Sequence, residues 1–174
     1  MLLIDDETHS YWDHITGEAV HGPLKGAALP SFPVHHTTVG AQLQRDPQTP
    51  LFRPSSGLLG AAMKLLLRKG ALHTKGVIPP FFRGTMGEAD ERLDELSNGL
   101  GVVVEGRARF YPLDRLGEPI EEDWSGRTLR VALGELDGAP QAVWTDDGSR
   151  PMQLLSRWYG FSFSFPGCGI YAAD

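Results

Sequence analysis

Glycine and proline constrain this fold more than any other feature of the sequence. The chain has 174 residues, of which 21 are glycine and 13 are proline, and both types are spread along its whole length. Because these residues interrupt regular elements and mark turns, they favour many short elements over a helical bundle. We find no internal repeat and no long linker. The length fits one domain, so residues 1–174 are predicted to form a single domain.

The second half of the chain carries patterns that are typical of strands. Two β-hairpins are predicted, one around the pair Glu105-Gly106 and one around Asp137-Gly138. The predicted strands are 101–104 with 107–111, and 128–133 with 141–145. From Tyr159 to Phe165 aromatic residues alternate with small ones, which predicts a further strand with one aromatic face and one small face.

Two helices are predicted between the N-terminal region and these strands. Ser55 and Ser56 can cap a helix that runs through Lys69 and ends at Gly70. Residues 85–88 have the spacing of a capping box and open a second helix, which Asn98-Gly99 would end. The predicted fold class is therefore α+β and β-rich, with antiparallel hairpins and two helices packed on one face.

Charge and hydropathy exclude two classes of partner. The net charge is −6 and no basic run is longer than Arg68-Lys69, so a nucleic-acid partner is not expected. The apolar stretch from Leu58 to Leu67 is about half the length that a membrane-spanning helix needs, so no membrane span is expected. One cysteine leaves the cellular compartment open. If the chain is complete as given, we expect it in the cytoplasm, because it begins without a signal peptide.

The first 26 residues are the place where we expect chemistry. The segment from Trp12 to His21 combines two histidines, His14 and His21, with the carboxylates of Asp13 and Glu18. Imidazoles and carboxylates are ligands for transition metals, and a carboxylate can orient a metal-bound imidazole. A transition metal at these histidines is one interpretation. Histidines that only order a polar loop through hydrogen bonds are the other.

A second candidate group lies near the C-terminus. Cys168 is the one cysteine of the chain, and Arg157 and Trp158 precede it by about ten residues. A thiolate forms readily only beside a cation or a helix N-terminus, and Arg157 is the nearest cation in sequence. The alternative is that Cys168 is a small buried residue of the core.

The run Met1-Leu2-Leu3-Ile4 bears on the completeness of the chain. It is apolar, leads directly into the acidic motif Asp5-Asp6-Glu7-Thr8, and is predicted to be a strand inside the sheet. A natural domain rarely begins with a central strand whose partner is absent. We therefore expect that an upstream segment is missing from the chain, and that the exposed edge of this strand could support self-association.

Several of these motifs together resemble a bacterial family known as domain of unknown function 3179, in particular its branch labelled "(seleno)protein". The motifs are residues 3–8, 10–18, 21–26, 86–92, 99–102, 110–113 and 157–168. The family implies no reaction. The branch implies an upstream segment that carries a cysteine or selenocysteine. It also implies an acidic residue at the position of Gly169.

Our leading interpretation is a redox-related domain whose thiol or selenol element is missing from this chain. The loop Trp12–His21 and the strand Arg157–Cys168 would then form one pocket. His14 or His21 would transfer a proton or bind a metal, Arg157 would favour a thiolate or an anionic ligand, and Trp12 and Trp158 would exclude water. The alternatives are a non-catalytic module that binds a small molecule or a metal, and an inactive truncated remnant.

Overall fold

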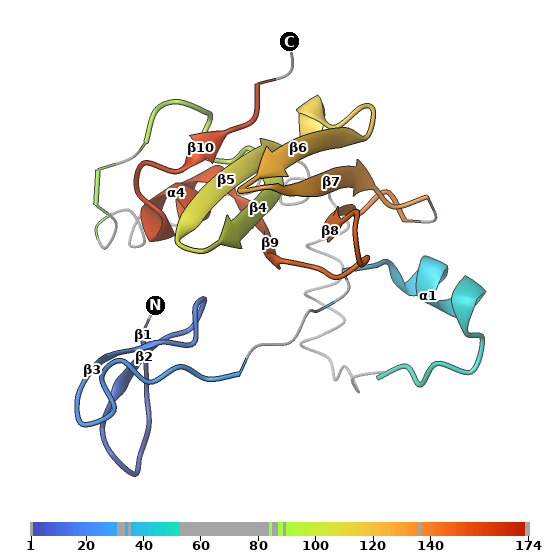
Figure 1. Cartoon of the computed structure of the whole chain (residues 1–174). Coiled ribbons are helices and arrows are strands. Elements are labelled where there is room, and N and C mark those ends of the chain that lie inside the picture. Colours follow the sequence, from blue (N-terminus) through green and yellow to red (C-terminus); the bar gives the residue numbers. More distant parts are fainter. Residues whose placement is uncertain are drawn as a thin grey trace. The chain divides into compact units, whose positions relative to one another are not determined.

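The computed structural model describes residues 2–30, 34, 36–52, 84, 87–88, 90–135 and 137–172. The chain divides into two compact units, unit 1 (Met1–Val34) and unit 2 (His35–Asp174), and we describe each by itself (Figure 1). That all 174 residues form one domain stays a prediction.

Unit 1 is a small antiparallel sheet with the strand order β1-β2-β3. The run at the N-terminus is a strand, as predicted, but this order puts it at an edge of the sheet and not between other strands. Leu3 of β1 lies opposite Trp12 of β2, and Tyr11 of β2 lies opposite His21 of β3. The strands are β1 (Leu2–Ile4), β2 (Tyr11–Asp13) and β3 (Ala19–His21).

The first sheet of unit 2 has the strand order β10-β5-β4-β9. The hairpin around Glu105-Gly106 is confirmed, because β4 and β5 pair antiparallel on either side of these two residues. Both turn residues have positive φ, 50° and 78°, which is the conformation that a tight two-residue hairpin needs. The strands are β4 (Asn98–Val104), β5 (Arg107–Pro112), β9 (Met152–Arg157) and β10 (Gly169–Ile170).

The second sheet of unit 2 has the strand order β6-β7-β8. The predicted hairpin around Asp137-Gly138 is confirmed by the antiparallel pairing of β7 with β8. Unit 2 also contains the single-turn 3-10 helix η1 (Leu113–Arg115) and the helix α1 (Val39–Arg45), which Thr38 caps. The strands are β6 (Ile120–Trp124), β7 (Arg127–Leu133) and β8 (Pro140–Trp144).

Strand alternation gives unit 2 two apolar layers. Tyr111 packs with residues of β7 and β8 on one side of the β4-β5 sheet, whereas Phe110 packs with α4 (Trp158–Ser164) on the other. Successive side chains of a strand point to opposite faces, so neighbours in β5 serve different layers. On the α4 side, Gly101 of β4 lies directly under Phe161 and leaves no room for a Cβ atom.

The strand predicted from Tyr159 to Phe165 is wrong. The chain forms β9 up to Arg157 and then turns into the helix α4. The aromatic residues fit both periods, because Trp158, Phe161 and Phe165 are also spaced for one face of a helix. Trp158 and Phe161 are buried and Phe163 is exposed, which is the helical pattern and not the alternating one.

The helix predicted from residue 85 is also wrong where the structure describes it, because residues 90–97 form turns. The side chains of Asp90 and Asp94 accept hydrogen bonds from the backbone N–H groups of Arg92 and Leu96, two residues on. Such local bonds compete with a helix. The carbonyl of Ser97 accepts from the N–H of Trp158 instead of from a helical neighbour. The helix predicted over residues 55–69 lies outside the described residues.

The fold class is confirmed as α+β and β-rich. The helices of the described part are α1 and α4, so neither is a helix that the sequence predicted. In this part of the chain no helix is both long enough and apolar enough to cross a membrane.

Candidate functional site

Asp5 organises the loop between β1 and β2. Its Oδ1 atom accepts hydrogen bonds from the backbone N–H of Thr8 at 2.6 Å and from the hydroxyl of Thr8 at 2.8 Å. Its Oδ2 atom accepts from the indole Nε1 of Trp12 at 2.7 Å. The indole donor, followed by the Thr8 donors, lowers the pKa of Asp5 to about 2. The carboxylate is therefore ionised at neutral pH, and it fixes the orientation of the Trp12 ring.

Ser10 joins this loop to the segment after β3. Its side chain is fully buried, and its hydroxyl accepts the backbone N–H of Leu24 at 3.1 Å and shares a hydrogen bond with Thr8 at 2.7 Å. Gly22 packs so closely on it that a Cβ atom would lie 2.7 Å from the Cα atom of Ser10. Gly22 also has a φ of 97°, which side-chain-bearing residues rarely adopt.

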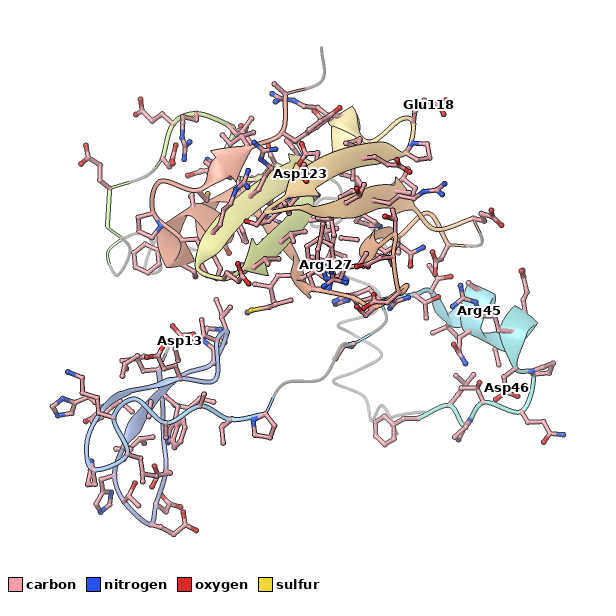
Figure 2. All side chains as sticks on the ribbon, in the orientation of Figure 1. Asp13, Arg45, Asp46, Glu118, Asp123 and Arg127 are labelled. Atoms are coloured by element: carbon pink, nitrogen blue, oxygen red, sulfur yellow. The ribbon has the colours of Figure 1, made fainter. Side chains whose placement is uncertain are left out.

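The predicted histidine site lies around the turn that joins β2 to β3 (Figure 2, where Asp13 is labelled). The Oδ1 atom of Asp13 accepts the N–H groups of Ile15 at 2.7 Å and Thr16 at 3.0 Å, so this carboxylate holds the turn together. His14 and Glu18 are exposed. His21 is exposed as well, and its ring meets that of Tyr11 edge to face at 5.6 Å.

The structure gives a metal centre no set of ligands within the residues it describes. In that part of the chain no group of three or more histidine, cysteine, aspartate or glutamate side chains is placed to hold an ion. Two imidazoles and a carboxylate would be needed at minimum for the predicted site. The metal and the shared pocket of His14 and His21 stay predictions.

A hollow of about 450 Å³ lies in unit 1, beside the loop that Asp5 organises. Of the predicted site residues, Trp12 lines it. The other walls were missed, because the apolar run at the N-terminus predicts only a strand and no pattern marks the leucines after β3. The lining residues are Leu3, Ile4, Asp5, Glu7, Thr8, Trp12, Leu24 and Leu29.

Cys168 is a buried residue of the layer between β5 and α4, packed with Phe110, Trp158 and Phe161. Burial raises the pKa of its thiol, and the nearby Arg92 opposes this rise in part. Because a thiolate is the reactive form of cysteine, a raised pKa leaves less of the reactive form at neutral pH.

Arg92 is the cation that the structure shows at Cys168. Its Nη1 atom donates to the carbonyl of Cys168 at 2.9 Å, its Nη2 atom pairs with Asp90 at 2.6 Å, and its guanidinium lies 5.3 Å from the ring centre of Trp158. No local pattern indicates this contact, because Arg92 is 76 residues away from Cys168.

Of the predicted partners of Cys168, Trp158 lies in the same buried cluster as the cysteine. Trp158 is fully buried, and its Nε1 atom donates to the carbonyl of Asp90 at 2.7 Å. Arg157 ends β9, lies opposite Asn98 in the β4-β9 ladder and precedes the first turn of α4. The role of Arg157 toward a thiolate stays a prediction. So does the common pocket with the loop Trp12–His21, because its two walls belong to different units.

A polar cluster in unit 2 was also missed. Glu122 of β6 accepts from the hydroxyl of Tyr111 and from the guanidinium of Arg109, both at 2.7 Å, and from the indole of Trp124 at 3.3 Å. Burial alone would raise the pKa of Glu122, but these three donors outweigh it and the pKa is lowered. Burial and the bond to Glu122 raise the pKa of Tyr111. Each of these groups has a hydrogen-bond partner, and the bonds of Arg109 and Tyr111 to Glu122 connect β5 to β6.

Comparison with known proteins finds one family model that matches the N-terminal part of the chain. Residues 1–59 match the model of the family described as "Protein of unknown function (DUF3179)". This confirms the family resemblance over these residues, while the "(seleno)protein" branch and the truncation stay predictions. Neither the curated proteins nor the solved structures include a significant match to the chain.

Proposed function

We propose that this chain, whose residues 1–59 match the DUF3179 family model, binds a small molecule in the hollow of unit 1. One observation carries the proposal: the hollow of about 450 Å³ has apolar walls around an oriented tryptophan. Sites for small molecules are concave, mostly apolar and of this size, with a few polar groups that fix the ligand. The hollow also lies within the segment that the family model matches.

The walls indicate the chemistry of the ligand. Leu3, Leu24 and Leu29 supply aliphatic surface, and Trp12 supplies an aromatic ring whose polar edge already donates to Asp5. The oxygens of Asp5 accept bonds from Thr8 and Trp12, whereas Glu7 adds an exposed carboxylate at the rim. An apolar or aromatic molecule with a cationic amine fits this combination, because an ammonium group is attracted by carboxylates and by the face of an indole ring.

The charge of unit 1 favours the same class of ligand. Residues 1–34 contain five carboxylates and a single lysine, Lys25, with no arginine. A surface with an excess of one sign attracts ligands of the opposite sign and repels those of the same sign. Anionic apolar molecules should therefore bind more weakly than cationic ones of the same shape.

The binding module is better supported than thiol chemistry. The redox interpretation places the reactive thiol or selenol outside this chain, and burial raises the pKa of Cys168, the one thiol that the chain itself contains. A thiol in such a position reacts slowly, since its nucleophilic form is depleted. The hollow of unit 1 needs no ionisation of a buried group to bind its ligand.

The test is a titration of the ¹⁵N-labelled chain with 1-naphthylmethylammonium as a probe, followed by NMR. We expect shifts at the indole N–H of Trp12 and at the amides of Leu24 and Leu29. The substitution Leu24→Ala should weaken binding about tenfold, because it removes apolar contact from the wall. Val20→Ala, which changes an exposed residue of β3 outside the hollow, should leave the affinity unchanged.

The anionic analogue 1-naphthoate tests the charge argument separately. It should bind more weakly than the ammonium probe, and the difference should shrink as salt screens the carboxylates. The proposal would be overturned if the shifts were confined to unit 2, or if Leu24→Ala and Val20→Ala had the same effect on the affinity.

A further inference from the structure

Two carboxylates line the hollow of unit 1, and their surroundings differ. Asp5 is partly buried at the start of the loop between β1 and β2, whereas Glu7, two residues on, is exposed. Both side chains are acidic, but an ammonium group that binds one of them needs an oxygen atom with a vacant acceptor position. The hydrogen bonds of the two residues decide which of them offers one.

The carboxylate of Asp5 is already occupied by donors of its own loop. Its Oδ1 atom accepts from the N–H of Thr8 at 2.6 Å, and its Oδ2 atom accepts from the indole of Trp12 at 2.7 Å. The hydroxyl of Thr8 lies between the two oxygens, at 2.8 and 2.9 Å. A ligand that bound Asp5 would have to displace one of these donors, and displacing the indole would release a ring that forms a wall of the hollow.

The carboxylate of Glu7 has the opposite environment. Within the residues that the structure describes, it has no hydrogen bond and no ion pair. The loop that carries it is nevertheless closed on both sides. The N–H of His9 donates to the carbonyl of Asp5 at 3.1 Å, and the N–H of Asp5 donates to the carbonyl of Ser10 at 3.2 Å. A charge on an ordered loop costs little further ordering when a ligand binds.

Asp6 provides a matched comparison within the same loop. It is the neighbouring carboxylate and is also exposed, but it does not line the hollow. Asp6 and Glu7 thus carry the same charge in adjacent positions, and a ligand in the hollow contacts the second of them.

We infer that Glu7 selects cationic ligands for this hollow by pairing with their ammonium group, while Asp5 positions the Trp12 ring for the apolar part of the ligand. The inference rests on the proposed binding function and assigns its charge preference to one residue. Because Glu7 is exposed, the ion pair contributes a preference of a few-fold, and the apolar walls supply most of the affinity.

The test combines two ligands with two carboxylates of the full chain. The first ligand is 1-naphthylmethylammonium, and the second is 1-naphthalenemethanol, which is neutral and of nearly the same shape. Glu7→Gln should raise the dissociation constant of the ammonium probe about fivefold and leave that of the alcohol unchanged, because the charged ligand alone loses a partner. Asp6→Asn, which removes the same charge beside the hollow, should change either constant by less than about twofold.

Reversal of the charge gives a second and larger effect. In Glu7→Lys the order of affinities should invert, so that 1-naphthoate binds more tightly than the ammonium probe, whereas Asp6→Lys should keep the order of the parent chain. The amide spectrum of unit 1 without ligand checks that each variant is folded.

Asp5→Asn separates the positioning of the ring from the selection of charge. It removes an acceptor of Thr8 or Trp12, so the indole N–H resonance of Trp12 should move in the free chain. The ammonium probe and the alcohol should then both bind more weakly, by factors that agree within about twofold. Glu7→Gln should leave the indole resonance of the free chain in place.

The outcomes distinguish this inference from the binding function on which it rests. If neither probe shifts the resonances of unit 1 in the parent chain, the binding function fails and the inference fails with it. If both probes bind, but Glu7→Gln and Asp6→Asn have equal effects on the ammonium probe, the hollow binds ligands and the role of Glu7 is overturned. The same holds if Asp5→Asn, and not Glu7→Gln, removes the preference for the ammonium probe over the alcohol.

Discussion

Different interactions stabilise each of the two units of this protein internally. Unit 2 has two apolar layers, and in one of them Leu100, Val102, Leu129 and Val131 are almost completely buried. Unit 1 has hydrogen-bonded turns instead, and its aliphatic side chains stay largely exposed. Burial of apolar surface is the main driving force of folding. Unit 2 is thus expected to supply most of the stability, and unit 1 the surface available for binding.

This difference predicts which substitutions are costly in each unit. In unit 2 the damaging changes are those that alter the volume of the core, because close-packed interiors relax only partly around a void or an added group. In unit 1 the damaging changes are those that remove a hydrogen-bonding group from a turn, because little apolar contact holds the turns in place.

The largest effect is expected for Phe110→Ala. Phe110 is fully buried between Trp158 and Phe161, at ring distances of 5.2 and 5.5 Å. Removing the ring should lower the free energy of unfolding by about 3–5 kcal/mol, measured by guanidinium denaturation with tryptophan fluorescence. The control is Phe163→Ala, at a ring that is 52% exposed, with an expected loss below about 0.5 kcal/mol. Equal losses would contradict the core described here.

A smaller loss in the same unit is expected for Gly101→Ala. The added Cβ atom would collide with the ring of Phe161, so β4 and α4 would have to separate, at a cost of about 1–3 kcal/mol. The matched control is Gly160→Ala in α4, where no atom lies within 4 Å of the new Cβ. Because alanine favours a helix over glycine, that variant should be slightly more stable than the parent chain.

In unit 1 the corresponding change is Ser10→Ala. It removes the acceptor of the Leu24 N–H and the partner of the Thr8 hydroxyl, which leaves a backbone donor unsatisfied. The expected loss is about 1–2 kcal/mol, and it should appear as faster hydrogen exchange of the Leu24 amide. The denaturation midpoint of unit 2 should not move. A shift of that midpoint would show that the two units unfold together.

The smallest effect is expected from the titration of Asp5. The pKa of this carboxyl in the folded chain is about 2, below its ordinary value of 3.8. A lowered pKa means that the ionised group stabilises the fold above pH 3.8, and that this contribution is lost as the pH falls toward 2. The indole N–H resonance of Trp12 should shift with a midpoint near 2. Asp5→Asn should abolish this shift, and a midpoint near 4 would contradict the indole–carboxylate bond.

Local sequence patterns predicted the hairpins correctly but misassigned the aromatic segment. Glu105-Gly106 and Asp137-Gly138 specify turns through the conformations of their own backbones, so nearby sequence is sufficient. The aromatic residues from Tyr159 to Phe165 satisfy both a strand and a helix period. A long-range hydrogen bond favours the helix over the strand. The carbonyl of Ser97, which is distant in sequence, accepts the first N–H of α4.

The candidate site was predictable only in part for the same reason. Trp12 stands in a segment rich in carboxylates and histidines, which marks it as a candidate, and it does line the hollow. Leu24 and Leu29 reach the same hollow through the turn that Ser10 and Gly22 hold together, and no local pattern marks such a closure. Arg92 and Glu122 likewise find their partners only after the chain has folded.

Native-state hydrogen exchange of the full chain tests the difference between the units most directly. We predict that the amides of β4 and β5 exchange only through global unfolding, whereas the bonded amides of unit 1, such as that of Leu24, open at a lower free energy. Addition of 1-naphthylmethylammonium should slow exchange in unit 1 and leave unit 2 unchanged. Equal protection of both units, with the same response to denaturant, would contradict this difference and would support a single cooperative domain of 174 residues.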